Sequence, residues 1–116
     1  MPATVLVVDD EPNIRLLCRI NLELEGYEVV EARTLAAARS AVEAHEVDVV
    51  LLDLHVGHEN GRALLEELRS RTPPVPVALV TGSAELHPAG DESADATLVK
   101  PFTIDALLET VRALAG

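Results

Sequence analysis

The amino-acid sequence predicts an α/β fold, a doubly wound parallel sheet of five strands with helices on both faces. The main observation is that short runs rich in β-branched residues alternate with stretches whose apolar residues recur at helical spacing. In addition, the first run, TVLVV at 4–8, is apolar almost throughout, which is typical of a strand covered on both faces. The 116 residues have the length of one domain, so we interpret 1–116 as a single domain.

The strand at 4–8 stops at two aspartates, and a helix is expected to follow it. Pro12 suits the first turn of that helix, and Gly26 is expected to close it. The apolar spacing predicts that four residues face inward and three charged residues face outward. The inward set is Ile14, Leu17, Cys18 and Leu22, and the outward set is Arg15, Arg19 and Glu23.

The second and third strands are expected at 27–31 and 47–52. Thr34 is expected to cap the helix between them, which runs to about His45. A polar loop follows the third strand, and then a helix that ends before the two prolines of 72–74. The expected inner face of that helix is Gly61, Leu64, Leu65 and Leu68.

The fourth strand is expected at 75–80, with Pro76 near its start, and a short fifth strand at 96–99. Thr103 is expected to cap the final helix. The segment 83–95 should hold the fourth helix of the pattern, but it contains a proline and a glycine and has no strong apolar stripe. We therefore expect that helix to be short or irregular.

The composition excludes several classes of function. Twenty acidic residues against nine basic ones give a net charge of −11, which repels phosphate backbones and argues against direct binding of nucleic acid. Cys18 is the only cysteine, so no internal disulfide can form, and we interpret it as a small core residue. The chain has no signal peptide and no apolar stretch of about 20 residues, so a cytoplasmic protein without a membrane segment is expected.

Polar residues stand where the predicted strands end. They are Asp9 and Asp10, Asp53, Thr81 and Lys100. The carboxyl ends of parallel strands meet at one edge of the sheet, so these side chains should converge. Three close carboxylates repel one another and usually hold a cation, and oxygen ligands favour Mg²⁺ or Mn²⁺ over Zn²⁺. A cation, a lysine and a hydroxyl around one carboxylate make a phosphoryl-transfer site, with Asp53 as the nucleophile.

Five segments, in this order, resemble the receiver domain of two-component response regulators. They are VLVVDDEP at 5–12, VVLLDL at 49–54, Gly61, ALVTGS at 78–83 and LVKPF at 98–102. The resemblance covers essentially the whole chain. It implies a flavodoxin-like sheet with strand order 2-1-3-4-5 and a role in signal transduction.

The resemblance also implies how the site works. Asp53 would be the phosphoacceptor of a phosphorelay, taking a phosphoryl group from a sensor histidine kinase or phosphotransfer protein with Mg²⁺ as cofactor, or Mn²⁺ in its place. Asp10 would bind the metal directly and Asp9 largely through water, and the main-chain carbonyl of His55 would complete the protein's ligands. The partner that receives the output is not specified by the sequence.

Two residues would grip the phosphoryl group. Thr81 is similar to the switch hydroxyl of the family, and Lys100 to the lysine that pairs with the phosphoryl group, with a cis bond between Lys100 and Pro101. Three departures from the family pattern stand beside this. Thr97 occupies a position that is often aromatic, Gly57 loosens the loop after Asp53, and the interval from Thr81 to Lys100 is short.

Alternative functions follow from these departures. A degenerate receiver would act as a protein-binding module without a phosphorylation-driven change. Thr97 and the shortened fourth-helix region favour it, and the complete set of Asp9, Asp10, Asp53, Thr81 and Lys100 opposes it. A phosphatase with an aspartyl intermediate is disfavoured because no second domain forms a substrate pocket, so we expect a protein that supports its own phosphorylation and dephosphorylation and is not a turnover enzyme. His55 and His58 are interpreted as solvated loop residues in preference to a transition-metal site, and His55 is a candidate for shaping access of water to the phosphoryl group.

Overall fold

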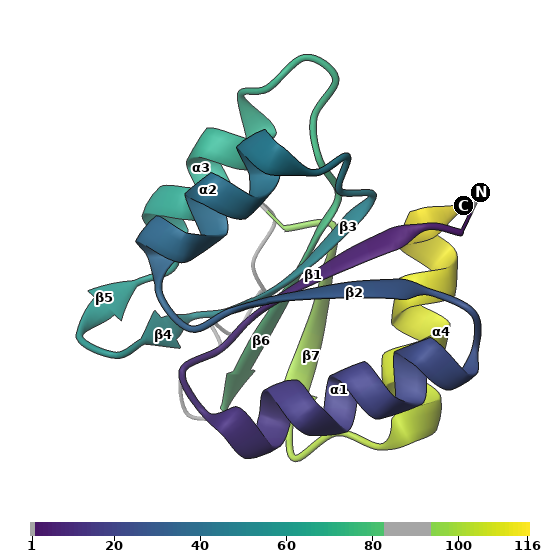
Figure 1. Ribbon diagram of the computed structural model, residues 1–116. Helices are drawn as coiled ribbons and strands as arrows, with labels where there is room; N and C mark the ends of the chain where they lie inside the picture. Colours follow the sequence, from purple (N-terminus) through teal and green to yellow (C-terminus); the bar gives the residue numbers. More distant parts are fainter. Residues whose placement is uncertain (1, 83–93) are drawn as a thin grey trace.

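The computed structural model describes residues 2–82 and 94–116. Its centre is a five-stranded sheet with the order β2-β1-β3-β6-β7, in which all neighbouring strands are parallel (Figure 1). The strands are β1 (Thr4–Val8), β2 (Glu28–Ala32), β3 (Val49–Asp53), β6 (Val77–Gly82) and β7 (Ala96–Lys100). The predicted fold class and the order implied by the family resemblance are therefore both confirmed.

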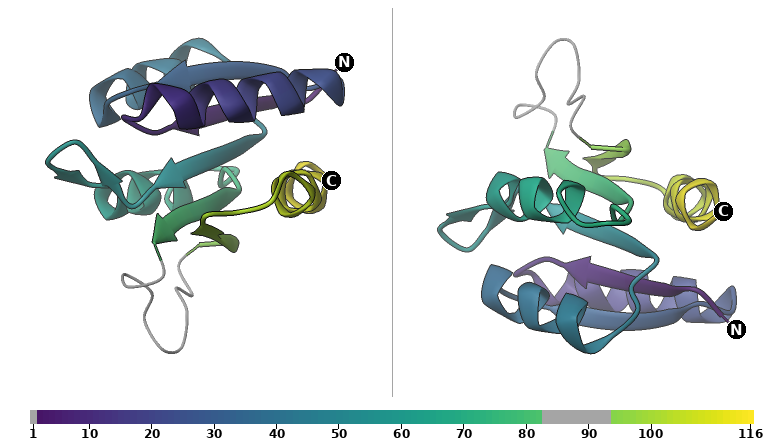
Figure 2. Two further views of the ribbon diagram at one scale, coloured as in Figure 1. Left: turned by 90° about the horizontal axis from the view of Figure 1, so that it is seen from below. Right: turned by 90° about the horizontal axis from the view of Figure 1, so that it is seen from above.

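Four helices of the described residues pack on the two faces of this sheet (Figures 1 and 2). Helices α2 (Leu35–Ala44) and α3 (Arg62–Arg69) bury their apolar residues against one face. Helices α1 (Pro12–Leu24) and α4 (Ile104–Ala115) cover the other. The short or irregular fourth helix predicted at 83–95 falls almost wholly on residues 83–93, which lie outside the described part of the chain.

Two apolar layers explain why the central strands read as continuous apolar runs. In β1, Leu6 and Val8 belong to the cluster beneath α2 and α3, whereas Val5 and Val7 belong to the cluster beneath α1 and α4. Successive side chains of a strand point to opposite faces, so every residue of such a strand must be apolar when both faces are covered. The run ends at the polar edge where Asp9 follows.

The helix caps follow the sequence prediction. The Thr34 hydroxyl accepts a hydrogen bond of 3.0 Å from the main-chain N–H of Ala37, and Thr103 accepts one of 3.0 Å from Ala106. Each satisfies an amide at the start of its helix that has no partner within the helix. The start of α3 is stabilised by Asn60, whose side-chain oxygen accepts from the N–H of Arg62 at 2.8 Å.

Helix α1 follows the predicted inner face at Ile14, Cys18 and Leu22, and departs from the prediction at Leu17 and Arg15. Cys18 and Leu22 are buried as expected, but Leu17 is 38% exposed. Arg15, predicted to face solvent, has a side chain only 16% exposed because its guanidinium lies between α1 and β2, where it pairs with Glu31. The helix is rotated so that this ion pair faces inward and Leu17 faces outward.

The polar loop predicted after β3 contains a small hairpin. Strands β4 (His55–Val56) and β5 (Glu59–Asn60) pair antiparallel and project away from the main sheet (Figure 1). Gly57 and His58 connect them, and Gly57 has a φ of +62°, which suits a glycine at the first position of a two-residue hairpin turn.

Two further features of the chain bear on the predictions. The Lys100–Pro101 peptide bond is cis, as the family resemblance implies, and so is Thr72–Pro73. Among the helices of residues 2–82 and 94–116, none combines the length and the apolar character that crossing a bilayer requires.

Candidate functional site

The carboxyl edge of the sheet brings together the acidic residues that the sequence predicts. Asp53 is the last residue of β3 and Asp9 directly follows β1, its neighbour in the sheet. Carboxylate oxygens of Asp9, Asp10 and Asp53 lie within 4.8 Å of one another. Asp9 and Asp53 are buried, and Asp10 is exposed at the mouth of the site. Three acids from two separate strands thus converge as predicted.

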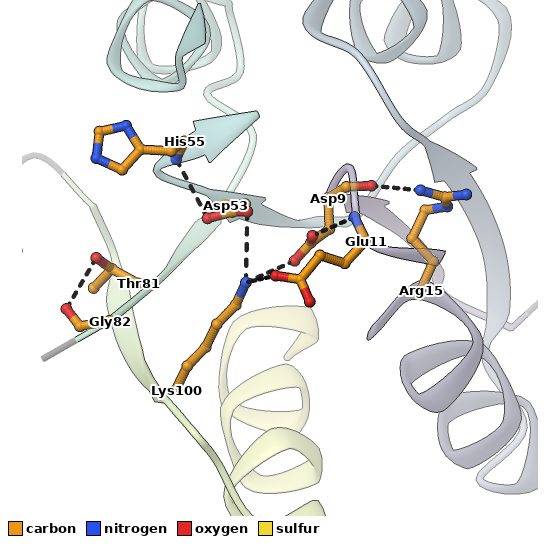
Figure 3. Close-up of polar contacts among 8 residues, drawn as sticks. All are labelled: Asp9, Glu11, Arg15, Asp53, His55, Thr81, Gly82 and Lys100. Carbon is orange, nitrogen blue, oxygen red and sulfur yellow. Dashed lines mark hydrogen bonds and ion pairs between the residues drawn. The ribbon is translucent and has the colours of Figure 1, made fainter. Parts of the chain in front are cut away.

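Lys100, at the end of β7, extends its side chain toward Asp9, Glu11 and Asp53 (Figure 3). Its Nζ lies 3.1 Å from Oδ2 of Asp9, 3.5 Å from Oδ2 of Asp53 and 3.7 Å from Oε1 of Glu11. Burial by itself would lower the pKa of Lys100, but the hydrogen bond to Asp9 and the charges of the three carboxylates raise it. The ammonium group is therefore held charged and is shared among three acids.

Asp53 carries an electrostatic cost in this environment. Burial, and next the neighbouring charge of Asp9, raise the pKa of Asp53 to about 6, although Lys100 and the N–H of His55 favour the ionised form. That N–H donates to Oδ1 of Asp53 at 3.3 Å. At neutral pH, the site thus contains more negative charge than Lys100 alone stabilises.

The donor set of the cluster fits a hard divalent cation. All three side chains offer carboxylate oxygens, and a cation beside Asp53 would offset the burial and the charge of Asp9 that raise its pKa. Oxygen-only sites suit Mg²⁺ or Mn²⁺, which bind through a few carboxylates and keep some of their water. The exposed position of Asp10 leaves the cluster open to solvent on one side.

Asp9 is fixed by contacts to each of its polar groups. Its N–H donates to the carbonyl of Ala32 at 3.1 Å, and its Oδ1 accepts from the N–H of Glu11 at 2.9 Å. Its own carbonyl accepts from a terminal nitrogen of Arg15 at 2.7 Å. The main chain that carries Asp9 and Asp10 is therefore tied to strand β2 and to helix α1.

Thr81 lies on β6, beside the strand that ends in Asp53. Its side chain is buried, and its hydroxyl donates to the carbonyl of Gly82 at 3.3 Å. In Figure 3 the hydroxyl points toward Gly82 on the side of the site away from the acidic cluster. The strand places this residue at the predicted edge, with the hydroxyl engaged by its own main chain.

The imidazole of His55 is exposed and, in Figure 3, points away from the carboxylates. Its contribution to the geometry of the site is the main-chain N–H on Asp53. His58 is exposed at the tip of the hairpin. Among the described residues, the cluster of side chains that could hold a metal ion comprises the three aspartates and neither histidine.

Three residues near the site have contacts that the sequence analysis did not assign to them. Glu11 forms the third ion pair of Lys100, and Arg15 binds the carbonyl of Asp9. At Gly61, an added Cβ would lie 2.5 Å from the carbonyl oxygen of Asp53, so the main chain of α3 approaches the acid too closely for any side chain. Gly61 is part of the family resemblance, which was the only available signal for it.

Comparisons with known proteins bear on the family to which the chain is similar. The family model described as the response regulator receiver domain matches residues 5–112. The transcriptional regulatory protein KdpE of Mycobacterium tuberculosis is 40% identical over 111 residues, which cover 94% of this chain and 49% of KdpE. TcrX, a probable transcriptional regulatory protein of the same species, is 36% identical, with 97% of this chain and 50% of TcrX covered. The chain thus spans about half the length of these curated relatives.

Solved structures show the same fold. The response regulator TrrA of Thermotoga maritima, solved in complex with Mg²⁺ and BeF, superposes with a TM-score of 0.86 at 34% identity, covering 97% of this chain and 98% of TrrA. The chemotaxis protein CheY4 of Vibrio cholerae superposes with a TM-score of 0.87 at 27% identity, covering 98% of this chain and 99% of CheY4.

Proposed function

The chain belongs to the receiver domains of two-component response regulators, and we propose that Asp53 is its phosphoacceptor. The observation that supports this assignment is the convergence of Asp53 with Asp9, Asp10 and Lys100 at one edge of the sheet. The proposed phosphodonor is the phosphohistidine of a sensor kinase or phosphotransfer protein. An output domain or partner would then read the phosphorylated state.

In the proposed reaction a carboxylate oxygen of Asp53 attacks the phosphorus atom of the phosphohistidine. A P–O bond forms as the P–N bond breaks, and the imidazole nitrogen leaves with the electron pair of that bond. Lys100 lies 3.5 Å from Asp53 and would neutralise charge on the transferred group. Asp53 must be ionised to attack. A pKa of about 6 leaves most of this carboxyl group ionised, and therefore reactive, at neutral pH.

Asp9, Asp10 and Asp53, with the main-chain carbonyl of His55, would hold Mg²⁺, or Mn²⁺ in its place. When bound, the ion supplies positive charge to the carboxylates and to the phosphoryl oxygens. The complex of TrrA with Mg²⁺ and BeF supports this assignment by relationship. The buried carboxylates contribute the rest, since they fix the position of the attacking oxygen.

After transfer, the new phosphoryl group would compete with Asp9, Glu11 and the carbonyl of Gly82 for Lys100 and Thr81. Lys100 would move from Asp9 and Glu11 toward the phosphoryl oxygens, and the hydroxyl of Thr81 would exchange the carbonyl of Gly82 for them. Thr81 adjoins the end of β6, so this rearrangement would act on the segment that follows the strand.

The surface of α1 offers a place for the phosphodonor. Within the described chain, the exposed large apolar side chains all lie on this helix, namely Leu16, Leu17, Ile20 and Leu24. The helix begins at Pro12, immediately after the turn that carries Asp9 and Asp10, so a partner packed on this patch would have its histidine close to Asp53. An Ile20→Glu variant should slow transfer from the cognate partner and leave phosphorylation by a small acyl phosphate unchanged.

The central experiment follows the intact mass of the protein during incubation with Mg²⁺ and a small acyl phosphate. We expect an increase of one phosphate that disappears in Asp53→Asn and in the presence of a chelator. No modification of the wild type would refute the proposal. Continuous release of phosphate from varied esters would contradict the part of the proposal that this is not a turnover enzyme.

A cytoplasmic location is also part of the proposal, since the unpaired Cys18 fits a reducing compartment.

A further inference from the structure

Arg15 connects strand β2 to the turn that carries two of the three acids. Its Nε donates to Oε1 of Glu31 at 3.2 Å, and one of its terminal nitrogens donates to the main-chain carbonyl of Asp9 at 2.7 Å (Figure 3). The guanidinium is largely buried, with the side chain 16% exposed. A planar guanidinium can hold two acceptors in fixed directions at once, which a single ammonium group cannot do.

These contacts link strand β2 to Asp9 by two routes. Strand β2 binds Asp9 directly through the carbonyl of Ala32 and indirectly through Glu31 and Arg15. The main chain of Asp9 is thereby held at both its N–H and its carbonyl. Since its carboxylate is held by Glu11 and Lys100, the residue has little freedom to turn.

We propose that Arg15 is a positioning residue of the metal site, which keeps the turn from Asp9 to Glu11 in the conformation that brings its carboxylates close to Asp53. This inference rests on the metal-dependent phosphoacceptor proposed above. Partners that orient metal ligands without touching the metal commonly affect affinity by about 10–100-fold when they are changed. Arg15 contacts the main chain of one such ligand.

Charge alone predicts the opposite effect. A guanidinium beside three carboxylates repels a cation, so removal of its positive charge should strengthen binding of Mg²⁺. A positioning role predicts weaker binding, because the carboxylates lose their alignment. The sign of the change therefore separates the two roles, and Arg15→Lys removes the two-acceptor geometry while it keeps the charge.

Arg19 provides a matched control one turn further along α1. It pairs with the other oxygen of Glu31 at 2.9 Å, but its main-chain acceptor is the carbonyl of Val29 at 3.2 Å, near the start of β2, whereas Asp9 binds Ala32 at the end of that strand. Arg19→Lys therefore perturbs the same ion-pair network without touching the turn of the site. Thermal unfolding in metal-free buffer would show whether the two substitutions have similar costs in stability.

The test is calorimetric titration of MgCl₂ into the metal-free wild type, Arg15→Lys, Arg15→Met and Arg19→Lys. We expect both Arg15 variants to bind Mg²⁺ about 10-fold more weakly and Arg19→Lys to bind as the wild type does. Wild-type affinity in Arg15→Lys, tighter binding in Arg15→Met, or equal weakening in Arg19→Lys would each overturn the positioning role. A wild type that binds no Mg²⁺ would instead refute the metal site of the proposed function, so the two failures are distinguishable.

Discussion

Replacement of Asp53 by asparagine should stabilise the fold at neutral pH. The pKa of Asp53 is raised from 3.8 to about 6, first by burial and then by Asp9. Each pKa unit corresponds to about 1.4 kcal/mol, so the ionised carboxylate costs the folded state roughly 3 kcal/mol above pH 6. This cost already includes the favourable contact with Lys100, so asparagine should give a net gain of up to about 3 kcal/mol, or up to roughly 12 °C in melting temperature.

The sign of the pH dependence follows from the same shift. Above pH 6 both the folded and the unfolded wild type are ionised at Asp53, and the full cost is present. As the pH falls from about 6 toward 3.8, the folded state takes up its proton first, and the advantage of Asp53→Asn should decline. Urea unfolding of both proteins between pH 4 and 8, in metal-free buffer, measures this difference.

Two comparisons make that measurement decisive. Glu109→Gln removes an exposed acid in the middle of α4, which is not part of the acidic cluster, and should give no pH-dependent gain. Millimolar Mg²⁺ should raise the melting temperature of the wild type and have less effect on Asp53→Asn, because binding to the folded state stabilises it. An Asp53→Asn variant less stable than the wild type at pH 7.5, or a wild type indifferent to Mg²⁺, would refute the reasoning.

Three further substitutions test other parts of the site. Gly61→Ala should lower the free energy of unfolding by about 1–3 kcal/mol and slow phosphorylation by acyl phosphate, because its Cβ would lie 2.5 Å from the carbonyl oxygen of Asp53; wild-type rates would contradict this. Lys100→Met should raise the pKa of Asp53 above about 6, since Lys100 lowers it, and NMR titration of the side-chain carboxyl carbon measures the shift. The thiol of Cys18, whose pKa burial and Asp9 raise to about 12, should resist disulfide reagents until the protein unfolds, and rapid labelling of the native protein would disprove this.

Much of the fold could be predicted because its signals are local. The first strand is an apolar run that ends at two acids, and β1 has the predicted bounds, Thr4–Val8. Thr34 and Thr103 cap the helices that follow them. The strand predicted at 75–80 starts two residues before the observed strand β6, which begins at Val77. Pro76 has no N–H to donate to a neighbouring strand, so the strand begins after it.

The positions of Leu17 and Arg15 on α1 could not be predicted from apolar spacing. The helix has apolar residues around most of its circumference, so several rotations bury a similar number of them. The observed rotation is the one in which Arg15 reaches both Glu31 and the carbonyl of Asp9. Both acceptors are distant in sequence or belong to the main chain, and neither leaves a trace in hydrophobic periodicity.

The site residues were predictable for a different reason. Strand ends of a parallel sheet meet at one edge, so topology alone brings Asp9, Asp53 and Lys100 together. Topology does not specify which residues support them. The closeness of Gly61 to Asp53 depends on the path of the β4–β5 hairpin, a tertiary detail that no sequence period encodes.

The burial of the Asp53 carboxylate has opposite effects on the fold and on its proposed chemistry. Asp53 weakens the folded state because it is buried beside Asp9 and because Lys100 is one cation shared among three acids. That unbalanced charge is what would make a cation or a rearranged Lys100 favourable at this edge. Neutral residues at this edge would make the fold more stable, but its stability would then not change when a cation or a phosphoryl group is bound. The electrostatic cost at Asp53 is therefore the physical basis on which metal binding and phosphorylation could change the structure of this receiver domain.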